Sequence, residues 1–423
     1  MQPNSQNENM NLKFKLGKRI SDELTHILAS TKKIPYIYLL VIAVGLILAI
    51  ALRFSMLDFK SIDFLHFTKG WYNTLRDQGF AAFRYGFYNY NPPYLYLLYL
   101  LIRFFPDMPA IITTKLPSLL SDFVCAWFAF KIVRINFPSG PLPVFAAFAV
   151  LFAPTVVLNS AVWGQADSIY TTALLASIYF LLKKQNVLAF VAFGISFAFK
   201  LQAVFLFPLL VALFLKGQVS WKHFLLIPLV MALALIPAWL AGRPLSDLLT
   251  IYLSQANTYG NNGELALNAP TFYTWLPQSH PIYDIFFPAG IVLALCIAFL
   301  FVFTIFEAKP NIVSHLLIQL ALSTLLLMPF FLPKMHDRYF FPADVLSIIY
   351  VFYFPSYFFV PLIISTISFF AYQPFLFGWE PVPMPLLAFG MFVIICIVMR
   401  HTIRNLYFSE PISAEKANNI LSD

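Results

Sequence analysis

The chain alternates long apolar stretches with short polar turns along nearly its whole length. Apolar stretches of about 16 to 24 residues recur, a length that suits a helix crossing a hydrocarbon core roughly 30 Å thick. The residues are 60% hydrophobic and only 11% charged, which leaves too little polar surface for a water-soluble globule of 423 residues. The sequence therefore predicts an all-α polytopic membrane protein.

Charge and cysteine content exclude two other classes. The net charge of +8 does not indicate a nucleic-acid partner, because the basic residues are spread between hydrophobic segments and form no basic surface with interleaved aromatic residues. Membrane lipids are the expected partners of these charges. The cysteines, Cys125, Cys296 and Cys396, lie inside apolar runs, so they are interpreted as small hydrophobic residues and not as a disulfide framework or a metal site.

The segment order predicts one transmembrane domain with two tails. Residues 1–34 are Lys-rich with leucines at a helical spacing, so we expect a cytoplasmic basic amphipathic segment and no removable signal peptide. Residues 35–405 are the expected transmembrane domain, with external loops at 58–111 and 242–282, and residues 406–423 are the cytoplasmic tail. About 12 transmembrane helices are expected, at 35–57, 112–134, 141–158, 168–183, 186–199, 201–216, 223–241, 283–306, 311–331, 341–353, 355–372 and 384–401.

Basic residues set the expected orientation. Most Lys and Arg residues fall on one side if the short apolar segment 92–105 is a partly embedded juxtamembrane helix and not a span. By the positive-inside rule that side is cytoplasmic. We therefore expect a multi-pass protein of the cell membrane with both termini in the cytoplasm.

Acids and cations gather on the external side in this topology. Ionisable groups at bilayer depth are costly unless they are partnered or functional, so their convergence at one membrane surface indicates a site for a charged lipid headgroup. The external motifs are Asp58, Asp63, Asn91-Pro-Pro-Tyr94, Trp163-Gly-Gln-Ala-Asp167, Lys200-Leu-Gln202 and Lys334-Met-His-Asp-Arg-Tyr339.

The order of these motifs carries a family resemblance. Together with Trp71, Gly79, Lys115-Leu-Pro117 and Asp122, it resembles the bacterial mannosyltransferase-like branch of the GT-C superfamily over about residues 35 to 345. The resemblance implies a GT-C-type glycosyltransferase that uses a polyprenyl-phosphate sugar donor and holds its catalytic carboxylate on juxtamembrane helices of the first external loop. The last motif is similar to the His-Glu-Lys-like segment of the endoplasmic-reticulum glucosyltransferases that use dolichyl-phosphate glucose, with Asp337 and Arg338 in place of Glu and Lys.

The resemblance also implies roles for single residues. Asp63, which is followed by Trp71 and Gly79, is the expected general base, while Asp58 competes for the same role from a position closer to the membrane. Asp167 is the second catalytic candidate, orienting the acceptor or the base. The implied donor-phosphate ligands are Lys115, Lys200, Lys334, His336 and Arg338. The implied substrate-binding residues are Asn91, Tyr94, Trp163, Gln165 and Gln202.

Structural alternatives stay open for several of these residues. Asp63 can solvate a loop, Asp167 can cap a helix, and Lys200 can extend its ammonium to the membrane interface. The cluster from Lys334 to Arg338 can be an ordinary solvated loop.

Asp122, inside a predicted span, more often bonds helices together than performs chemistry. Asn268 and Tyr273 can line an acceptor groove or belong to the interfacial aromatic belt.

The expected reaction is inverting transfer of a hexose to an extracytoplasmic hydroxyl of an unknown glycan, lipid or protein. Cations that stabilise the departing phosphate remove any obvious need for a metal, so neither a metal nor another cofactor is expected. A secondary transporter or flippase for lipid-linked sugars is the alternative, although such proteins place polar residues near the bilayer midplane. A polymerase or ligase that uses polyprenyl-pyrophosphate glycans is a second enzyme possibility.

Overall fold

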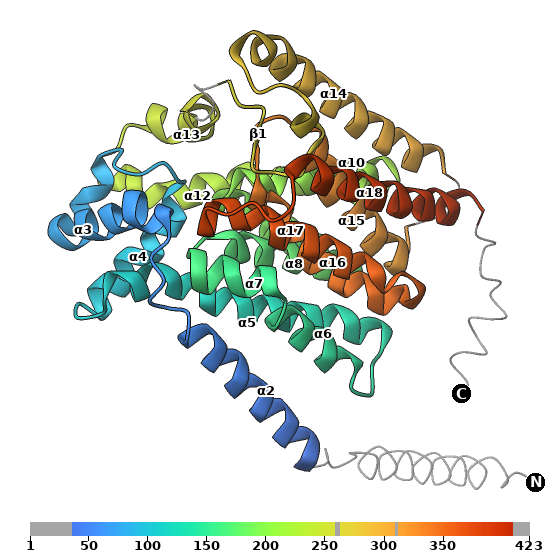
Figure 1. Cartoon of the computed structure of the whole chain (residues 1–423), viewed down its shortest axis with the longest axis horizontal. Coiled ribbons are helices and arrows are strands. Elements are labelled where there is room, and N and C mark those ends of the chain that lie inside the picture. The colour runs from blue at the N-terminus through green and yellow to red at the C-terminus, as the bar shows by residue number, and fades with distance from the viewer. Residues whose placement is uncertain (1–35, 259–262, 309–311, 409–423) are drawn as a thin grey trace, which may run out of the picture. The chain divides into compact units, whose positions relative to one another are not determined.

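The computed structural model describes residues 36–258, 263–308 and 312–408 (Figure 1). The chain divides into two compact units, residues 1–50 and 51–423, and each is described by itself. The predicted amphipathic segment 1–34 and the tail after residue 408 lie outside the described residues. The helix α2 (Tyr36–Phe54) begins in the first unit and ends in the second.

The rest of the second unit is almost entirely helical. Its elements are η1 (Phe64–Thr68), α3 (Lys69–Gln78), η2 (Gly79–Arg84), α4 (Pro92–Phe104), α5 (Ala110–Asn136), α6 (Leu142–Leu151), α7 (Pro154–Val157), η3 (Leu158–Trp163), α8 (Asp167–Leu182), α9 (Asn186–Phe199), η4 (Leu201–Leu206), α10 (Phe207–Leu215), α11 (Trp221–Phe224), α12 (Leu226–Leu240), α13 (Leu245–Thr258), β1 (Ala266–Leu267), η5 (Phe272–Trp275), α14 (His280–Glu307), α15 (Ser314–Phe331), β2 (Met335–His336), η6 (Asp337–Phe340), α16 (Phe341–Tyr353), η7 (Pro355–Tyr357), α17 (Phe359–Phe377) and α18 (Met384–Tyr407).

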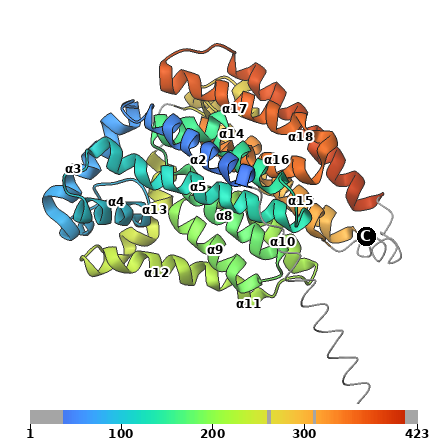
Figure 2. The same cartoon turned by 90° about the horizontal axis from the view of Figure 1, so that it is seen from below.

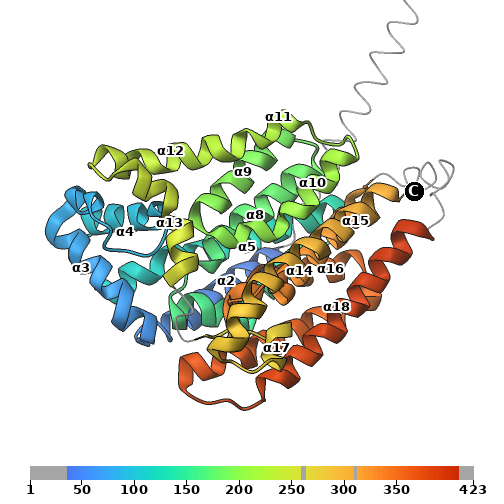
Figure 3. The same ribbon diagram turned by 90° about the horizontal axis from the view of Figure 1, so that it is seen from above.

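The second unit places its polar loops at one end of a helical bundle. Helices α5 and α8 lie between α9 and α12 on one side and α16, α17 and α18 on the other (Figure 2). Figure 3 shows α3, α4 and α13 together at one end, with α11 and the end of α18 at the other. Residues of both predicted external loops therefore gather at the same end.

The number of spans differs from the expectation. Within the described residues, seven helices are long and apolar enough to cross a membrane, or eight if the bent pair Leu142–Leu151 and Pro154–Trp163 is one span. Four shorter apolar helices are Asp167–Leu182, Asn186–Phe199, Leu201–Leu215 and Leu245–Ser254. The predicted polytopic helical fold is confirmed, but the count of 12 spans is not. Hydropathy detects each apolar segment, whereas only the structure shows how many residues of it are helical.

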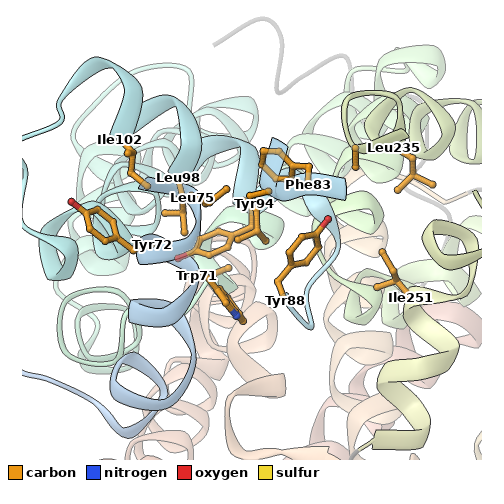
Figure 4. Packing of buried hydrophobic residues seen from close by; sticks show 14 of the residues in the cluster. Trp71, Tyr72, Leu75, Phe83, Tyr88, Tyr94, Leu98, Ile102, Leu235 and Ile251 are labelled. Atoms are coloured by element: carbon orange, nitrogen blue, oxygen red, sulfur yellow. The ribbon is translucent and has the colours of Figure 1, made fainter. Parts of the chain in front are cut away.

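The predicted first external loop folds as a small helical cap. α4 begins at Pro92 and Pro93, whose fixed φ and missing N–H suit a first helical turn, so the predicted juxtamembrane helix at 92–105 is confirmed as a helix. Trp71 of α3 packs against Tyr90 and Tyr94, and this aromatic cluster extends to α12 and α13 (Figure 4). Such rings each bury on the order of 150–250 Å², so the cap is held by a hydrophobic core that it shares with α12 and α13.

A buried ion pair ties the first span to the bundle. Arg53 donates from Nε to Asp122 Oδ2 at 2.9 Å, and the Ser160 hydroxyl donates to the same oxygen at 2.5 Å. Both charged side chains are almost fully buried. The prediction that Asp122 bonds helices together is confirmed, and removing one partner would leave a buried charge unpaired, at a cost of about 3–5 kcal/mol.

Candidate functional site

Asp63 is held by two side-chain donors from one distant segment. The Trp163 indole donates from Nε1 to Asp63 Oδ2 at 2.8 Å, and the Gln165 amide donates to the same oxygen. Oδ1 accepts no hydrogen bond from the described residues. Asp63 precedes the π-helical turn η1 and is partly exposed, and of its two carboxylate oxygens only Oδ2 is held by described donors.

The segment that carries these donors has an unusual backbone. Residues 158–163 form the π-helical turn η3, which ends at Gly164 with φ of +79°, in the left-handed region that favours glycine. The Ser61 hydroxyl donates to the Trp163 carbonyl at 2.8 Å. Tyr90 donates to Gln165 Oε1 at 2.9 Å, which orients the amide so that its NH₂ group faces Asp63.

Lys115 fastens the two segments together. Its ammonium donates to the carbonyl oxygens of Leu57 at 2.9 Å, Phe59 at 2.7 Å and Ala161 at 2.7 Å. Three donors on three carbonyls satisfy the ammonium completely. Lys115 therefore holds the chain on both sides of Asp58 to the segment that precedes Trp163, and Asp58 itself is exposed.

Asp167 organises the cations. Its side chain is fully buried; Oδ1 accepts from Lys200, and Oδ2 accepts from Asn159 at 3.0 Å and lies 3.7 Å from Arg338 Nε. Both oxygens are thus engaged, in contrast to Asp63. The guanidinium of Arg338 also lies 5.1 Å from the centre of the Trp163 ring.

Burial shifts the pKa values of three residues around Arg338. Burial, with the charges of Arg338 and Lys200, lowers the pKa of His336 well below its usual value, so the imidazole is neutral at pH 7. Burial raises the pKa of Asp337 to about 8, although Arg338 acts in the opposite direction. Burial also lowers the pKa of Lys200 to about 8, with Asp167 opposing the shift. Arg338 is therefore the most firmly charged cation of the cluster.

A short parallel pairing fixes the last motif. Ala266 pairs with Met335 and Leu267 with His336, so β1 of the predicted second external loop holds β2 in place. Lys334 has φ of +61° and points its ammonium toward the rings of Tyr283 and Phe287, at 5.2 and 4.8 Å. This separates Lys334 from the other cations.

A narrow cleft of about 40 Å³ opens beside the cations. It is lined by Asn89, Tyr90, Asn91, Phe199, Lys200, Gln202, Tyr252, His336, Arg338 and Tyr339. Among the sequence-predicted residues, the structure brings together Asp63, Asn91, Trp163, Gln165, Asp167, Lys200, Gln202, His336 and Arg338. Tyr94 lies in the aromatic core and donates to the Thr114 carbonyl at 2.9 Å. Tyr273 is likewise buried and bonded to the Phe331 carbonyl at 2.7 Å.

Sequence reasoning missed three participants. Tyr90 belongs to the motif that ends at Tyr94, but its role and that of Asn159 depend on contacts between side chains that no local pattern predicts. The β1–β2 pairing involves two residues on each side, which is too short for a strand signal. Within the described residues, no group of three or more His, Cys, Asp or Glu side chains is placed to hold a metal ion.

Comparison with known proteins supports the fold. No family model and no curated protein matches the sequence. The fold is similar to that of ArnT. The crystal structure of ArnT from Cupriavidus metallidurans bound to undecaprenyl phosphate aligns with a TM-score of 0.51 at 13% identity, covering 85% of this chain and 77% of that one. The apo structure of the same protein aligns with a TM-score of 0.45 at 14% identity, covering 85% and 76%.

The comparison with the lipid-bound structure shows a polytopic GT-C-type membrane fold, as the sequence predicted. It does not support the mannosyltransferase-like branch in particular.

Proposed function

We propose that this protein is an inverting GT-C-type glycosyltransferase that moves a hexose from a polyprenyl-phosphate donor to an acceptor hydroxyl outside the cytoplasm. The observation that carries the proposal is the adjacency of an anchored carboxylate and a buried cation cluster. Trp163 joins them, because its N–H donates to Asp63 while its ring face contacts Arg338.

In the proposed reaction, Asp63 is the general base. Its free oxygen accepts the proton of the acceptor hydroxyl as that oxygen attacks the anomeric carbon. The bond from the anomeric carbon to the phosphate oxygen breaks on the opposite side, and its electron pair leaves with the phosphate. One displacement inverts the anomeric centre. Asp58 is the weaker candidate, because no described side chain holds its carboxylate.

Arg338 and Lys200 are the proposed partners of the departing phosphate. Charge-assisted hydrogen bonds from a buried guanidinium and ammonium stabilise negative charge as it develops. His336 would contribute a neutral N–H donor, since its pKa is lowered by burial. Asp167 then acts by positioning both cations.

The remaining candidates divide by what they contact. Asn91 and Gln202 line the cleft and are proposed to touch substrate. Trp163 and Gln165 are proposed to position Asp63. We propose no substrate contact for Tyr94, Lys115 or Lys334. The polar groups of Tyr94 and Lys115 bond to backbone carbonyls, and the Lys334 ammonium lies over aromatic rings.

The donor class rests on two arguments. The cations fit one phosphate group, and the structural neighbour was crystallised with undecaprenyl phosphate. The motif order, which resembles the mannosyltransferase-like branch, is the basis for proposing a hexose. A polyprenyl tail stays in the bilayer, so a donor of this kind also explains why the enzyme is membrane-embedded.

The test is transfer by the purified protein with a panel of polyprenyl-phosphate hexoses. Asp63→Asn keeps the shape of the side chain and removes its basicity, so donor binding should persist while transfer falls by at least about 10²-fold. Asp58→Asn should be milder. If Asp63→Asn transfers normally and Asp58→Asn is inactive, the base is Asp58. Full activity of both variants would contradict the proposed chemistry.

A further inference from the structure

Arg243, a buried cation outside the cluster described above, has no acidic partner among the described residues. Arg243 lies between α12 and α13 and is only 8% exposed. Its Nε and Nη1 atoms are buried and make no hydrogen bond of good geometry to the described residues, and the nearest acceptor is the neutral hydroxyl of Tyr88. Asp247, the nearest acid along the chain, is exposed and accepts from Ser246 at 3.3 Å. An unpaired buried charge costs several kcal/mol, so a group that pairs with Arg243 would be strongly stabilising.

Hydroxyl groups surround this guanidinium. The centre of the Tyr88 ring lies 4.9 Å from Arg243 Cζ, and the Tyr88 hydroxyl is also buried without a hydrogen-bond partner of good geometry in the described residues. Tyr96 is close enough to Tyr88 and Arg243 to interact electrostatically with both. Its oxygen accepts from the Ala238 N–H at 3.0 Å, which leaves the hydroxyl proton free to donate. A cation and two hydroxyl donors form an environment for anionic oxygen.

The third guanidinium nitrogen faces an exposed glycine. A Cβ on Gly86 would stand 3.3 Å from Arg243 Nη2, so the absence of a side chain there leaves room beside that nitrogen. The exposed Arg84 adds a second positive charge nearby, since its Cδ atom lies 3.5 Å from where a Cβ on Gly242 would stand. An anion can therefore approach Nη2 over Gly86.

This location adjoins the cleft. Tyr88 is two residues before Tyr90, which lines the cleft together with Asn91. On the other side, α13 follows Arg243 and carries Tyr252, another cleft residue. Figure 4 shows Tyr88 directed toward the side where Leu235 and Ile251 lie, away from Trp71. Residues 88–91 therefore contribute Tyr90 and Asn91 to the cleft and Tyr88 to the surroundings of Arg243. The chain from Arg243 through α13 likewise contributes Tyr252 to the cleft.

We propose that Arg243, with Tyr88 and Tyr96, forms an anion-binding site for an acidic group, carboxylate or phosphate, on the acceptor. Assignment to the acceptor rests on the proposed function, because the donor phosphate is matched to Arg338 and Lys200. The acceptor would then be an acidic molecule whose charged group binds beside the cleft while its hydroxyl reaches Asp63.

Binding is tested with methyl phosphate and with acetate, on the full chain in neutral detergent, by the shift of the thermal unfolding midpoint. Arg338→Gln removes the proposed donor-phosphate ligand, so a response that persists in this variant reports a second site. In the Arg338→Gln background, Arg243→Gln should weaken the apparent affinity for the better probe by at least about tenfold. A response abolished by Arg338→Gln alone would overturn the proposal.

Two further variants separate binding from folding. Gly86→Ala keeps the guanidinium and narrows the approach to Nη2, so it should weaken the response, whereas Gly70→Ala, with open space around it, should not. In anion-free buffer Arg243→Met should unfold at the same or a higher temperature, because it removes an unpaired buried charge. A clearly lower midpoint would make Arg243 a structural residue and refute the site. Normal transfer by Asp63→Asn would refute the proposed function without affecting any of these results.

Discussion

At the scale of single residues, Trp163 has two separable contacts. Its N–H donates to Asp63 at 2.8 Å, while its ring contacts Arg338 on one side and stacks on Phe375 at 4.9 Å. The first contact anchors the proposed base, and the second shapes the proposed phosphate site. A substitution that removes one of them therefore tests the two functions independently.

Trp163→Phe should retain ring packing and lose the indole donor. A hydrogen bond to a charged group is worth about 1.5–3 kcal/mol, so turnover should fall by roughly 10-fold or more while donor affinity changes little. Trp163→Leu loses both contacts and should reduce both quantities. Turnover and donor titrations on folded protein measure this. Equal effects of the two variants would show that the N–H has no role of its own.

Asp337 should make stability depend on pH. Burial raises its pKa to about 8 from an ordinary value of 3.8, so the folded protein keeps a proton that the unfolded chain releases. Stability should therefore be full below about pH 4 and should be lost progressively as the pH rises toward about 8. Asp337→Asn removes this dependence. The unfolding temperature measured between about pH 5 and pH 9 gives this pH dependence, and Asp77→Asn, at an exposed position, is the control. Parallel curves for the wild type and Asp337→Asn would contradict the prediction.

At the scale of elements, the turn after η3 sets the geometry of the base. Gly164 has φ of +79°, and a Cβ there would stand 3.1 Å from Lys115 Cγ. Both the left-handed backbone and the close approach of the lysine that holds Leu57, Phe59 and Ala161 thus favour glycine. Gly140 offers a matched comparison, because its φ is +87° but nothing lies within 4 Å of its Cβ position.

Gly164→Ala should therefore destabilise the protein more than Gly140→Ala. A left-handed conformation costs a non-glycine residue about 1–2 kcal/mol, and this cost applies to both variants. Only Gly164→Ala also displaces Lys115, so it should in addition lower transfer. Thermal unfolding and turnover of the two variants give the comparison. Identical behaviour of both would mean that the contact with Lys115 is unimportant.

The sequence predicts elements better than it predicts their contacts. The apolar runs and the Pro92-Pro93 start of α4 are local signals, and the helices they predict are present. The length of a helix within an apolar run is not local, since tertiary packing and proline decide where it ends, and the expected 12 spans become seven or eight long helices in the described residues.

For the candidate site the same distinction holds. Asp63, Asp167 and Arg338 stand out because charges are rare in this chain. Asp63 has one bonded carboxylate oxygen, whereas both oxygens of Asp167 are bonded or paired. This difference depends on donors from other segments, namely Trp163 and Gln165 for Asp63 and Asn159 for Asp167. Residue type identifies the participants, and only long-range geometry separates their roles.

At the scale of the whole molecule, orientation in the membrane remains a prediction. We expect the end of the bundle that contains α3 to face outward and the turn between α8 and α9 to face the cytoplasm. Single cysteines at the exposed positions 77 and 184, in a background with Cys125, Cys296 and Cys396 replaced, should label from outside and from inside respectively. The opposite pattern would place the candidate site in the cytoplasm and remove an extracytoplasmic reaction.

The π-helical turns η1 and η3 affect how the chain tolerates changes in length. A π turn closes its hydrogen bond one residue further along than an α turn, so each holds an extra residue next to a site segment. Deleting one residue from η3 would allow an ordinary α-helix to form, with no clash and no lost charge. Each residue of an α-helix turns by about 100°, however, so Trp163 would be rotated away from Asp63. Related chains that keep every motif residue but lack one residue of η3 would have the same fold, and their tryptophan would no longer hold the proposed catalytic carboxylate in position.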